Sequence, residues 1–166
     1  MPVHPFAPVY TPASRALILG SFPSVRSRQQ NFYYGHERNR FWPVLCSILN
    51  ADAPQSTQQK CDLLNSHHIA LWDVVGQCTI HASSDSSIRN CVPNDVSWLL
   101  SKTQITSIFT NGQTAHRLYT RYLYPVTRIP DICLPSTSPA NAKWSFDALL
   151  APWRQVALAA ESEAGL

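Results

Sequence analysis

Charge, and negative charge above all, is scarce in this sequence of 166 residues. Charged residues make up only 14% of the chain against 45% hydrophobic residues, so the surface must rely on Ser, Thr, Asn and Gln. No apolar run approaches the ~20 residues that span a bilayer. The opening "MPVHPFAPVYTP" has neither a basic start nor a long apolar stretch, so it does not predict a signal peptide. We expect a cytoplasmic protein of one domain, residues 1–166, with 1–14 as an irregular lead-in.

Paired cysteines are also missing. The five cysteines are scattered without a C-x-x-C pair, and an odd number without a secretory signal predicts reduced thiols. Cys78, His81 and Cys91 lie close enough in sequence for zinc to be considered. Their spacing matches no standard zinc finger and no fourth ligand is obvious nearby, so we expect buried or loop residues here.

The few carboxylates are unevenly distributed. Up to Ala51 the only one is Glu37, and none occurs between Asp95 and Asp131. The basic residues of these two acid-poor segments are Arg15, Arg26, Arg28, Arg38, Arg40, Lys102, Arg117, Arg121 and Arg128. If the segments converge, they suit an anionic partner, and nucleic acid is the leading candidate. An ordinary solvated surface explains the charge alone equally well.

Several common enzyme motifs are absent. The sequence has no G-x-G-x-x-G after its first strand-like run, no G-x-x-x-x-G-K loop and no G-x-S-x-G elbow. The three lysines show no evident Schiff-base setting, and neither "GSFPS" nor "TNG" contains a carboxylate. Chemistry at these segments must therefore use amides, hydroxyls, backbone N–H groups and aromatic rings.

Strand-like runs alternate with helical patterns, which is typical of an α/β domain with a parallel sheet. Strands are predicted over residues 15–22, 69–75, 105–112 and within 127–137. Helices are predicted from near Asn39, over 55–66, 93–102 and 113–123, and from about 142 to 160. Functional crevices of such sheets lie outside the carboxyl ends of the strands. We therefore expect "GSFPS", "TNG" and "LPSTSPAN" to meet there.

The stretch "GSFPSVRSRQQNFYYGHERNRFWPVL", which begins at Gly20, combines aromatic rings, arginines and an asparagine. This mixture suits recognition of a nucleobase, because a base stacks on a ring while an amide bonds its edge. Together with "LWDVV", "FTNG" and "LPSTSPAN", in this order, it resembles the uracil-DNA glycosylase superfamily. The resemblance runs from about Leu17 to Trp153 and is greatest to the hypoxanthine-DNA (deoxyinosine) glycosylases.

The resemblance implies a three-layer α/β/α sandwich with a central four-stranded parallel sheet. It also implies a monomeric, monofunctional glycosylase of base excision repair, without a cofactor. The substrate would be double-stranded DNA containing a deaminated base, hypoxanthine above all. Ser21-Phe22 replaces the asparagine of mismatch-specific uracil enzymes, and the histidine of the most active uracil enzymes is missing, so uracil is the less favoured base.

The resemblance also implies roles for single residues. Asn39 matches the catalytic asparagine, Tyr34 the ring that stacks on the extruded base, and Phe22 lines the same pocket. Asn111 matches the position that reads the base edge. The implied DNA contacts are Ser24, Ser136, Thr137, Ser138 and Asn141, the last four in the loop that enters the minor groove.

Each of these roles has a structural alternative. Asn39 is equally suited to cap the helix that follows it, and Asn111 before Gly112 is a common turn residue. Three adjacent aromatic residues cannot all point one way, so one or two of residues 32–34 are expected in the core. At the level of the whole chain, the alternatives are a non-catalytic module that stacks exposed bases and a glycosylase that prefers uracil in G/U mismatches.

Overall fold

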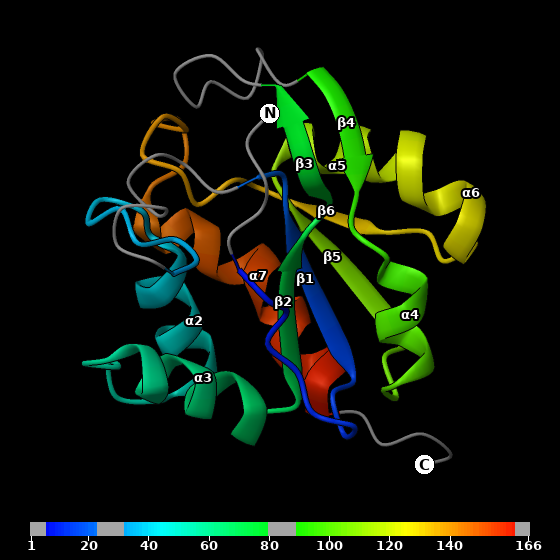
Figure 1. Cartoon of the computed structure of the whole chain (residues 1–166). Coiled ribbons are helices and arrows are strands. Elements are labelled where there is room, and N and C mark those ends of the chain that lie inside the picture. Colours follow the sequence, from blue (N-terminus) through cyan, green and yellow to red (C-terminus); the bar gives the residue numbers. More distant parts are fainter. Residues whose placement is uncertain (1–5, 23–31, 80–88, 162–166) are drawn as a thin grey trace.

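A central parallel sheet organises the computed structural model, which describes residues 6–22, 32–79 and 89–161. Its strands are β1 (Ala16–Gly20), β2 (Ile69–Asp73), β5 (Ser107–Asn111) and β6 (Ile132–Leu134). They lie in the order β2-β1-β5-β6, and every neighbouring pair is parallel (Figure 1). The predicted four-stranded parallel sheet is confirmed.

Strands β1 and β2 are buried along their whole length. Burial on both faces explains why their sequences are continuous apolar runs rather than alternating patterns. The register places Gly20 beside Asp73, Leu19 beside Thr110 and Asn111 beside Leu134. The carboxyl ends of the strands therefore align along one edge, which we call the carboxyl edge.

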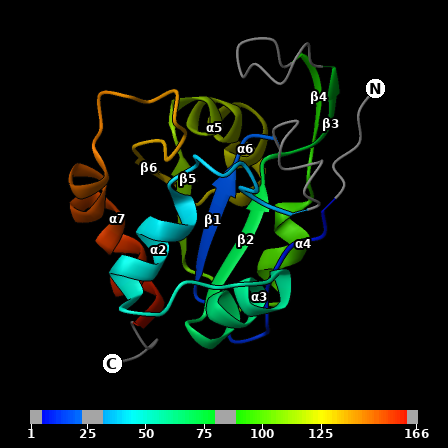
Figure 2. The same ribbon diagram turned by 90° about the vertical axis from the view of Figure 1, so that its left-hand side faces the viewer.

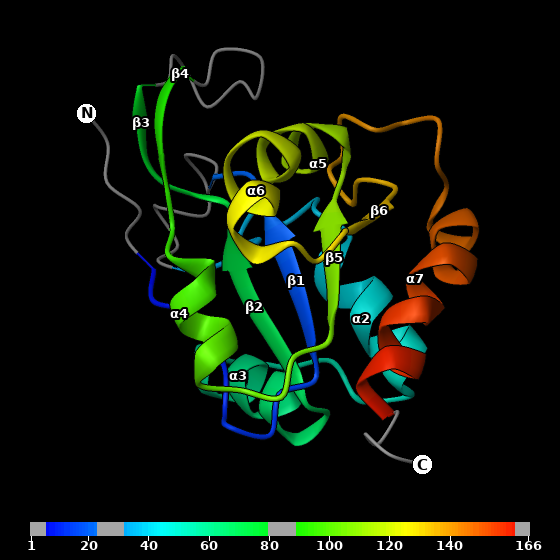
Figure 3. The ribbon, with the colours of Figure 1, turned by 90° about the vertical axis from the view of Figure 1, so that its right-hand side faces the viewer.

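Helices cover both faces of the sheet. The elements on one face are α2 (Phe41–Leu49), α3 (Thr57–Ser66) and α7 (Phe146–Glu161), seen in front of the sheet in Figure 2. Those on the other are α4 (Val96–Ser101), α5 (Gln113–Leu118), the π-helical turn η2 (Tyr119–Leu123) and α6 (Tyr124–Thr127) (Figure 3). This is the expected three-layer α/β/α sandwich.

Helices α3 and α4 begin at polar side chains that cap them. Ser56 Oγ accepts a hydrogen bond from Gln59 N (3.1 Å), which caps α3. Asp95 Oδ1 accepts one from Trp98 N (3.0 Å), so Asp95 caps α4, which begins at Val96 rather than at residue 93 as predicted. No helix in the described ranges is both long and apolar enough to cross a bilayer.

One element was not predicted. The expected strand over residues 69–75 ends at Asp73, and the chain continues into an antiparallel hairpin of β3 (Val75–Thr79) and β4 (Arg89–Pro93). Backbone bonds from Val74 N to Gly20 O (2.8 Å) and from Val75 N to Ser21 O (3.1 Å) turn the chain at this point. The hairpin sequences are largely polar and their pairing is irregular. They therefore lack the alternation of apolar and polar residues that predicts a strand.

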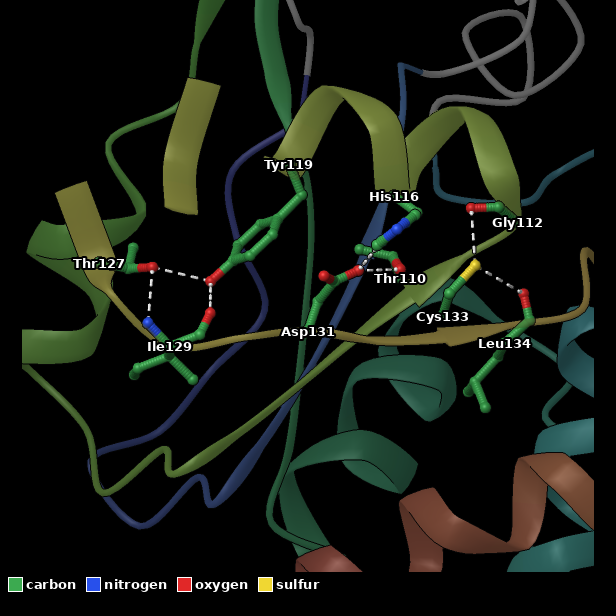
Figure 4. A network of polar contacts seen from close by, with 9 residues as sticks. All are labelled: Thr110, Gly112, His116, Tyr119, Thr127, Ile129, Asp131, Cys133 and Leu134. Carbon is green, nitrogen blue, oxygen red and sulfur yellow. Dashed lines mark hydrogen bonds and ion pairs between the residues drawn. The ribbon is translucent and has the colours of Figure 1, made fainter. Parts of the chain in front are cut away.

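A buried carboxylate ties the edge strand β6 to its neighbours (Figure 4). Asp131 Oδ2 accepts a hydrogen bond from Thr110 Oγ1 (2.6 Å) and lies 2.7 Å from His116 Nδ1. The Asp131 side chain is only 5% exposed. Because β5, α5 and the start of β6 meet at this carboxylate, the short strand β6 is held in register just before the loop that leads to α7.

Candidate active site at the carboxyl edge

Gly20, at the end of β1, is packed too closely to carry a side chain. A Cβ there would lie 2.3 Å from Asp73 Oδ1 and 2.8 Å from Tyr34 Oη. The buried Asp73 side chain and the Tyr34 hydroxyl therefore approach each other above this strand end. The glycine of "GSFPS" is explained by this close approach.

The aromatic residues divide between the core and the carboxyl edge. Phe32 and Tyr33 are buried in the core, which confirms the expectation for two of the three adjacent rings. Tyr34 is only half-buried and stacks on Phe41, with ring centroids 4.1 Å apart and planes 18° apart. Its backbone is left-handed, with φ 53°. Phe22 is 8% exposed.

Asn39 joins the start of α2 to the loop that follows β6. Its Oδ1 accepts one hydrogen bond from Phe41 N (2.9 Å) and another from Thr137 Oγ1 (2.8 Å). The first bond satisfies a backbone N–H of the first turn of α2, but Asn39 lies one residue before the N-cap, which is Arg40 and has no side-chain capping bond. The second connects Asn39 to a residue 98 positions away.

Asn111, at the end of β5, is bonded to the same threonine. Its Nδ2 donates to Thr137 Oγ1 (3.0 Å), and its Oδ1 accepts from Thr137 N (3.0 Å). Both ends of this amide are thus paired with Thr137, which is fully buried. The reading of a base edge by Asn111 stays a prediction, whereas its link through Thr137 to Asn39 is a feature of the structure.

Arg40 holds the loop of residues 135–145, which we call the β6–α7 loop and which lies along the carboxyl edge in Figure 2. Its guanidinium donates to the carbonyl oxygens of Thr137 (3.4 Å), Ser138 (3.0 Å), Asn141 (3.1 Å) and Trp144. Its backbone N also donates to Thr137 O (3.0 Å). In the sequence, Arg40 stands out only as one of the basic residues. The one available signal was that this loop has no carboxylate with which an arginine could pair.

The polar side chains of the loop bond mainly within it. Asn141 Nδ2 donates to Ser136 O (3.0 Å), and the Oγ atoms of Ser136 and Ser138 accept from Ser138 N and Ala140 N (both 3.1 Å). The loop is therefore a preformed structure rather than a free chain. The expected contacts of Ser136, Ser138 and Asn141 with DNA stay predictions, whereas the side chain of Thr137 is fully buried and does not face a DNA surface in this structure. Ser24 lies outside the described residues.

A pocket of about 600 Å³ opens on the side of the β6–α7 loop that faces α5. It is lined by Asn111, the first residues of α5, Cys133 and the exposed Trp144, among others. Phe22, Tyr34 and Thr137 are not among its described lining residues. Asn111 thus lies between this pocket on one side and Thr137 with Asn39 on the other.

The described basic residues are divided between the two edges of the sheet, and Arg26 and Arg28 lie outside the described residues. Arg15 precedes β1 at the opposite edge of the sheet, where its Nη1 donates to Ala160 O (2.9 Å). Lys102 lies near the same edge, since Gln104 N, two residues further on, bonds to Ser14 O. The Arg40 guanidinium is bonded to carbonyl oxygens of the β6–α7 loop. Arg117 on α5 is exposed.

Thiol and metal chemistry find no support in the described residues. Burial raises the pKa of the thiols of Cys46, Cys61 and Cys133, which keeps them protonated near neutral pH. No three His, Cys, Asp or Glu residues gather in the described ranges as a metal site would require. His81 of the zinc alternative lies outside them, as do the side chains of its two cysteines.

Gly112→Ala should destabilise the protein by ~1–3 kcal/mol, because φ 97° and ψ 168° are accessible essentially only to glycine. The new Cβ would also lie 3.0 Å from Ser136 Cβ, at the start of the β6–α7 loop. Urea unfolding measures the change, with the exposed Gln113→Ala as the matched control. A Gly112→Ala variant within about 0.5 kcal/mol of the parent would contradict the backbone argument.

Comparison with known proteins agrees with this architecture. The family model of the uracil DNA glycosylase superfamily matches residues 7–157. A hypoxanthine DNA glycosylase of Methanosarcina acetivorans is 31% identical over 144 residues, which cover 84% of this chain and 89% of that protein. One of Methanosarcina barkeri is 35% identical over 86 residues, but the match spans only 51% of this chain and 54% of that protein.

A solved structure shares the fold. The solution NMR structure of a candidate uracil DNA glycosylase from Methanosarcina acetivorans superposes with a TM-score of 0.76 at 29% identity. The superposition covers 91% of this chain and 96% of that one. The motif order, the three-layer fold and the match over nearly the whole chain lead to one conclusion. The chain belongs to the uracil DNA glycosylase superfamily, in the branch of the hypoxanthine DNA glycosylases.

Proposed function

We propose that this protein is a monofunctional DNA glycosylase that removes a deaminated base, hypoxanthine in the first place, from double-stranded DNA. The observation that carries the proposal is the position of Asn39. Its amide lies at the carboxyl edge, bonded to the β6–α7 loop on one side and next to the Tyr34–Phe41 ring stack on the other. The names of the two Methanosarcina relatives support hypoxanthine as the base.

The reaction is a hydrolysis of the N-glycosidic bond. The bond between C1′ of the deoxyribose and the base nitrogen breaks, and the bonding electron pair leaves with the base. The oxygen of a water molecule then bonds to C1′, and a proton of that water ends on the departing base. Positive charge develops on the sugar and negative charge on the base, so preorganised donors beside the base lower the barrier. Asn39 is the group in this site best placed for that role.

The remaining parts of the site serve access to the base. We propose that the half-buried Tyr34, which stacks on Phe41, is the ring on which an extruded base stacks, and that Phe22 contributes to the same pocket. The preformed, acid-free β6–α7 loop suits entry into a groove lined by phosphates. A deaminated base pairs weakly, so extruding it costs less than extruding a matched base, which contributes to selectivity. We propose that the protein performs these steps as a monomer and without a cofactor.

The test is incubation of the pure protein with a duplex that contains one inosine, followed by alkali. A glycosylase leaves an abasic site that alkali cleaves, whereas a module that only stacks bases leaves the strand intact. Duplexes with xanthine, uracil opposite guanine, and adenine at the same position complete the panel. We expect inosine to give the fastest cleavage and adenine none. Faster cleavage at uracil would overturn the assignment of the base but keep the glycosylase.

Borohydride should not trap the protein on damaged DNA, because a monofunctional glycosylase forms no Schiff base. No lysine among the described residues bonds to Asn39, Asn111 or Thr137. Lys60 instead lies over the Trp42 and Phe32 rings, 5.2 and 5.9 Å from their centroids. Denaturing electrophoresis after borohydride treatment checks this, with a known bifunctional glycosylase as the positive control. A covalent protein–DNA species would show a lyase mechanism instead.

A further inference from the structure

The orientation of the Asn39 amide is fixed by a group that can only donate. The backbone N–H of Phe41 points at one terminal atom of the amide, 2.9 Å away. Only the carbonyl oxygen of an asparagine accepts a hydrogen bond, so the atom that faces Phe41 N is Oδ1. The Nδ2 of Asn39 therefore points away from the start of α2.

The same reasoning fixes Asn111 and then the hydroxyl between the two amides. The backbone N–H of Thr137 donates to Asn111 Oδ1 at 3.0 Å, so Asn111 Nδ2 is the atom that faces Thr137 Oγ1 at 3.0 Å. Thr137 Oγ1 accepts that N–H, and its own proton is left to point at Asn39 Oδ1, 2.8 Å away. Hydrogen bonds thus run in one direction, from Asn111 through Thr137 to Asn39.

This chain of hydrogen bonds leaves Asn39 with one group available for a ligand, the amide nitrogen Nδ2. Its Oδ1 receives two hydrogen bonds, which occupy both lone pairs of a carbonyl oxygen. Its Nδ2 has two N–H groups and no hydrogen-bond partner among the described residues, and the side chain is only partly buried. An amide in this state donates to a ligand but has no acceptor left for the proton of an attacking water.

We infer that Thr137 is a positioning residue that locks the Asn39 amide with its oxygen inward, so that Asn39 donates to the departing base through Nδ2. The inference deepens the proposed function and rests on it. It selects between two roles for Asn39, because an asparagine that polarises the attacking water needs a free oxygen. The acceptors on the base are the ring nitrogen and carbonyl oxygen atoms, on which negative charge grows as the bond to C1′ breaks.

The burial of Thr137 strengthens the hydrogen bond that orients the Asn39 amide. The residue is fully buried, so water does not compete for its hydroxyl. Buried hydrogen bonds are stronger than exposed ones and polarise one another. A donor that is held in place before the reaction needs no reorganisation when charge develops, and this is the source of the catalytic effect.

The Asn39→Asp variant tests whether residue 39 acts by donating a hydrogen bond to the base or by accepting one. A carboxylate accepts both inward bonds, from Phe41 N and Thr137 Oγ1, but has no N–H for the base. We expect single-turnover excision of hypoxanthine from an inosine duplex to fall by ~10²–10³-fold, as on removal of a preorganised donor. Asn39→Asp excision at the parental rate or above would show that the residue accepts a proton or a water hydrogen bond, and would overturn the inference.

Thr137→Val and Thr137→Ser test whether the Thr137 hydroxyl orients the Asn39 amide. Valine has nearly the shape of threonine but no hydroxyl, and we expect excision to fall by about tenfold or more. Serine keeps the hydroxyl and should stay within about threefold of the parent. Thermal unfolding shows whether each variant is folded. In an Asn39→Ala background, Thr137→Val should cause no further loss of excision, because the amide that it positions is gone.

The outcomes separate this inference from the proposed function. Parental excision by Thr137→Val, or a Thr137→Ser variant as impaired as Thr137→Val, would overturn the positioning role while leaving the glycosylase intact. A parental protein that excises no base from any duplex of the panel would overturn the proposed function and the inference together. The Asn39→Asp result decides the direction of donation even if Thr137→Val does not fold.

Discussion

Asn39→Ser is expected to give a folded, DNA-binding protein whose single-turnover excision is lowered by ~10²–10³-fold. Serine also accepts a hydrogen bond from a backbone N–H two residues further on, so the contact with Phe41 N at the start of α2 can be replaced. Serine is shorter, however, and carries no amide to donate to the departing base. The measurement is hypoxanthine release from an inosine duplex with the enzyme in excess.

Asn39→Ala is the companion variant, because alanine removes the bond to Phe41 N as well as the amide. It should lose ~1 kcal/mol of stability through that bond and as much activity as Asn39→Ser. Duplex affinity should persist in both variants, since the loop bonds made by Arg40 do not involve Asn39. If Asn39→Ser excises inosine at close to the parental rate, Asn39 only supports the start of α2 and the catalytic assignment is wrong.

Arg40→Met is expected to lower single-turnover excision by ~10–100-fold, because small displacements of positioning groups cost that much. The guanidinium bonds to four carbonyl oxygens of the β6–α7 loop, and methionine keeps the length of the side chain without a donor. Arg40→Lys should recover little, since an ammonium is a point donor that cannot reach four separated acceptors. Excision rates and hydrogen exchange of residues 135–145 are the two readouts.

Arg38→Met is the matched control for this experiment. Arg38 lies two residues before Arg40, is exposed, and has no side-chain hydrogen bond or ion pair among the described residues. Both substitutions remove one positive charge, so a loss common to both reports the electrostatic attraction of DNA. Equal effects of Arg38→Met and Arg40→Met, with unchanged hydrogen exchange in the loop, would refute the structural role of Arg40.

The sheet could be predicted from the sequence because its signals are local. The runs at β1 and β2 are apolar throughout, as burial on both faces requires, and helical patterns separate the strands. The hairpin β3–β4 was missed because its pairing is irregular and its strands carry no clean alternation. The start of α4 was predicted at residue 93, but Pro93 belongs to β4 and Asn94 donates to Asp73 O (2.8 Å), so the helix begins only after Asp95.

The site was predicted only where a motif marks it. Asn39, Tyr34 and Asn111 were found through the resemblance to a family, and the structure places them around Thr137 and Phe41. The residues around Arg40 and Thr137 in the sequence do not indicate the hydrogen bonds that these two side chains make. Their hydrogen bonds join segments about 100 residues apart, as the separations of 97 and 98 positions show, and only the folded chain brings these together.

The most direct test of the central claim is the chemical identity of the product released from DNA. An inosine duplex is incubated with the parental protein and with Asn39→Ser, and the small molecules are separated by chromatography and identified by mass. We predict free hypoxanthine from the parent, in amounts equal to the abasic sites formed, and almost none from Asn39→Ser. Release of deoxyinosine, of a nucleotide or of no product by the parent would contradict the proposed glycosylase, and equal release of hypoxanthine by both proteins would contradict the role of Asn39.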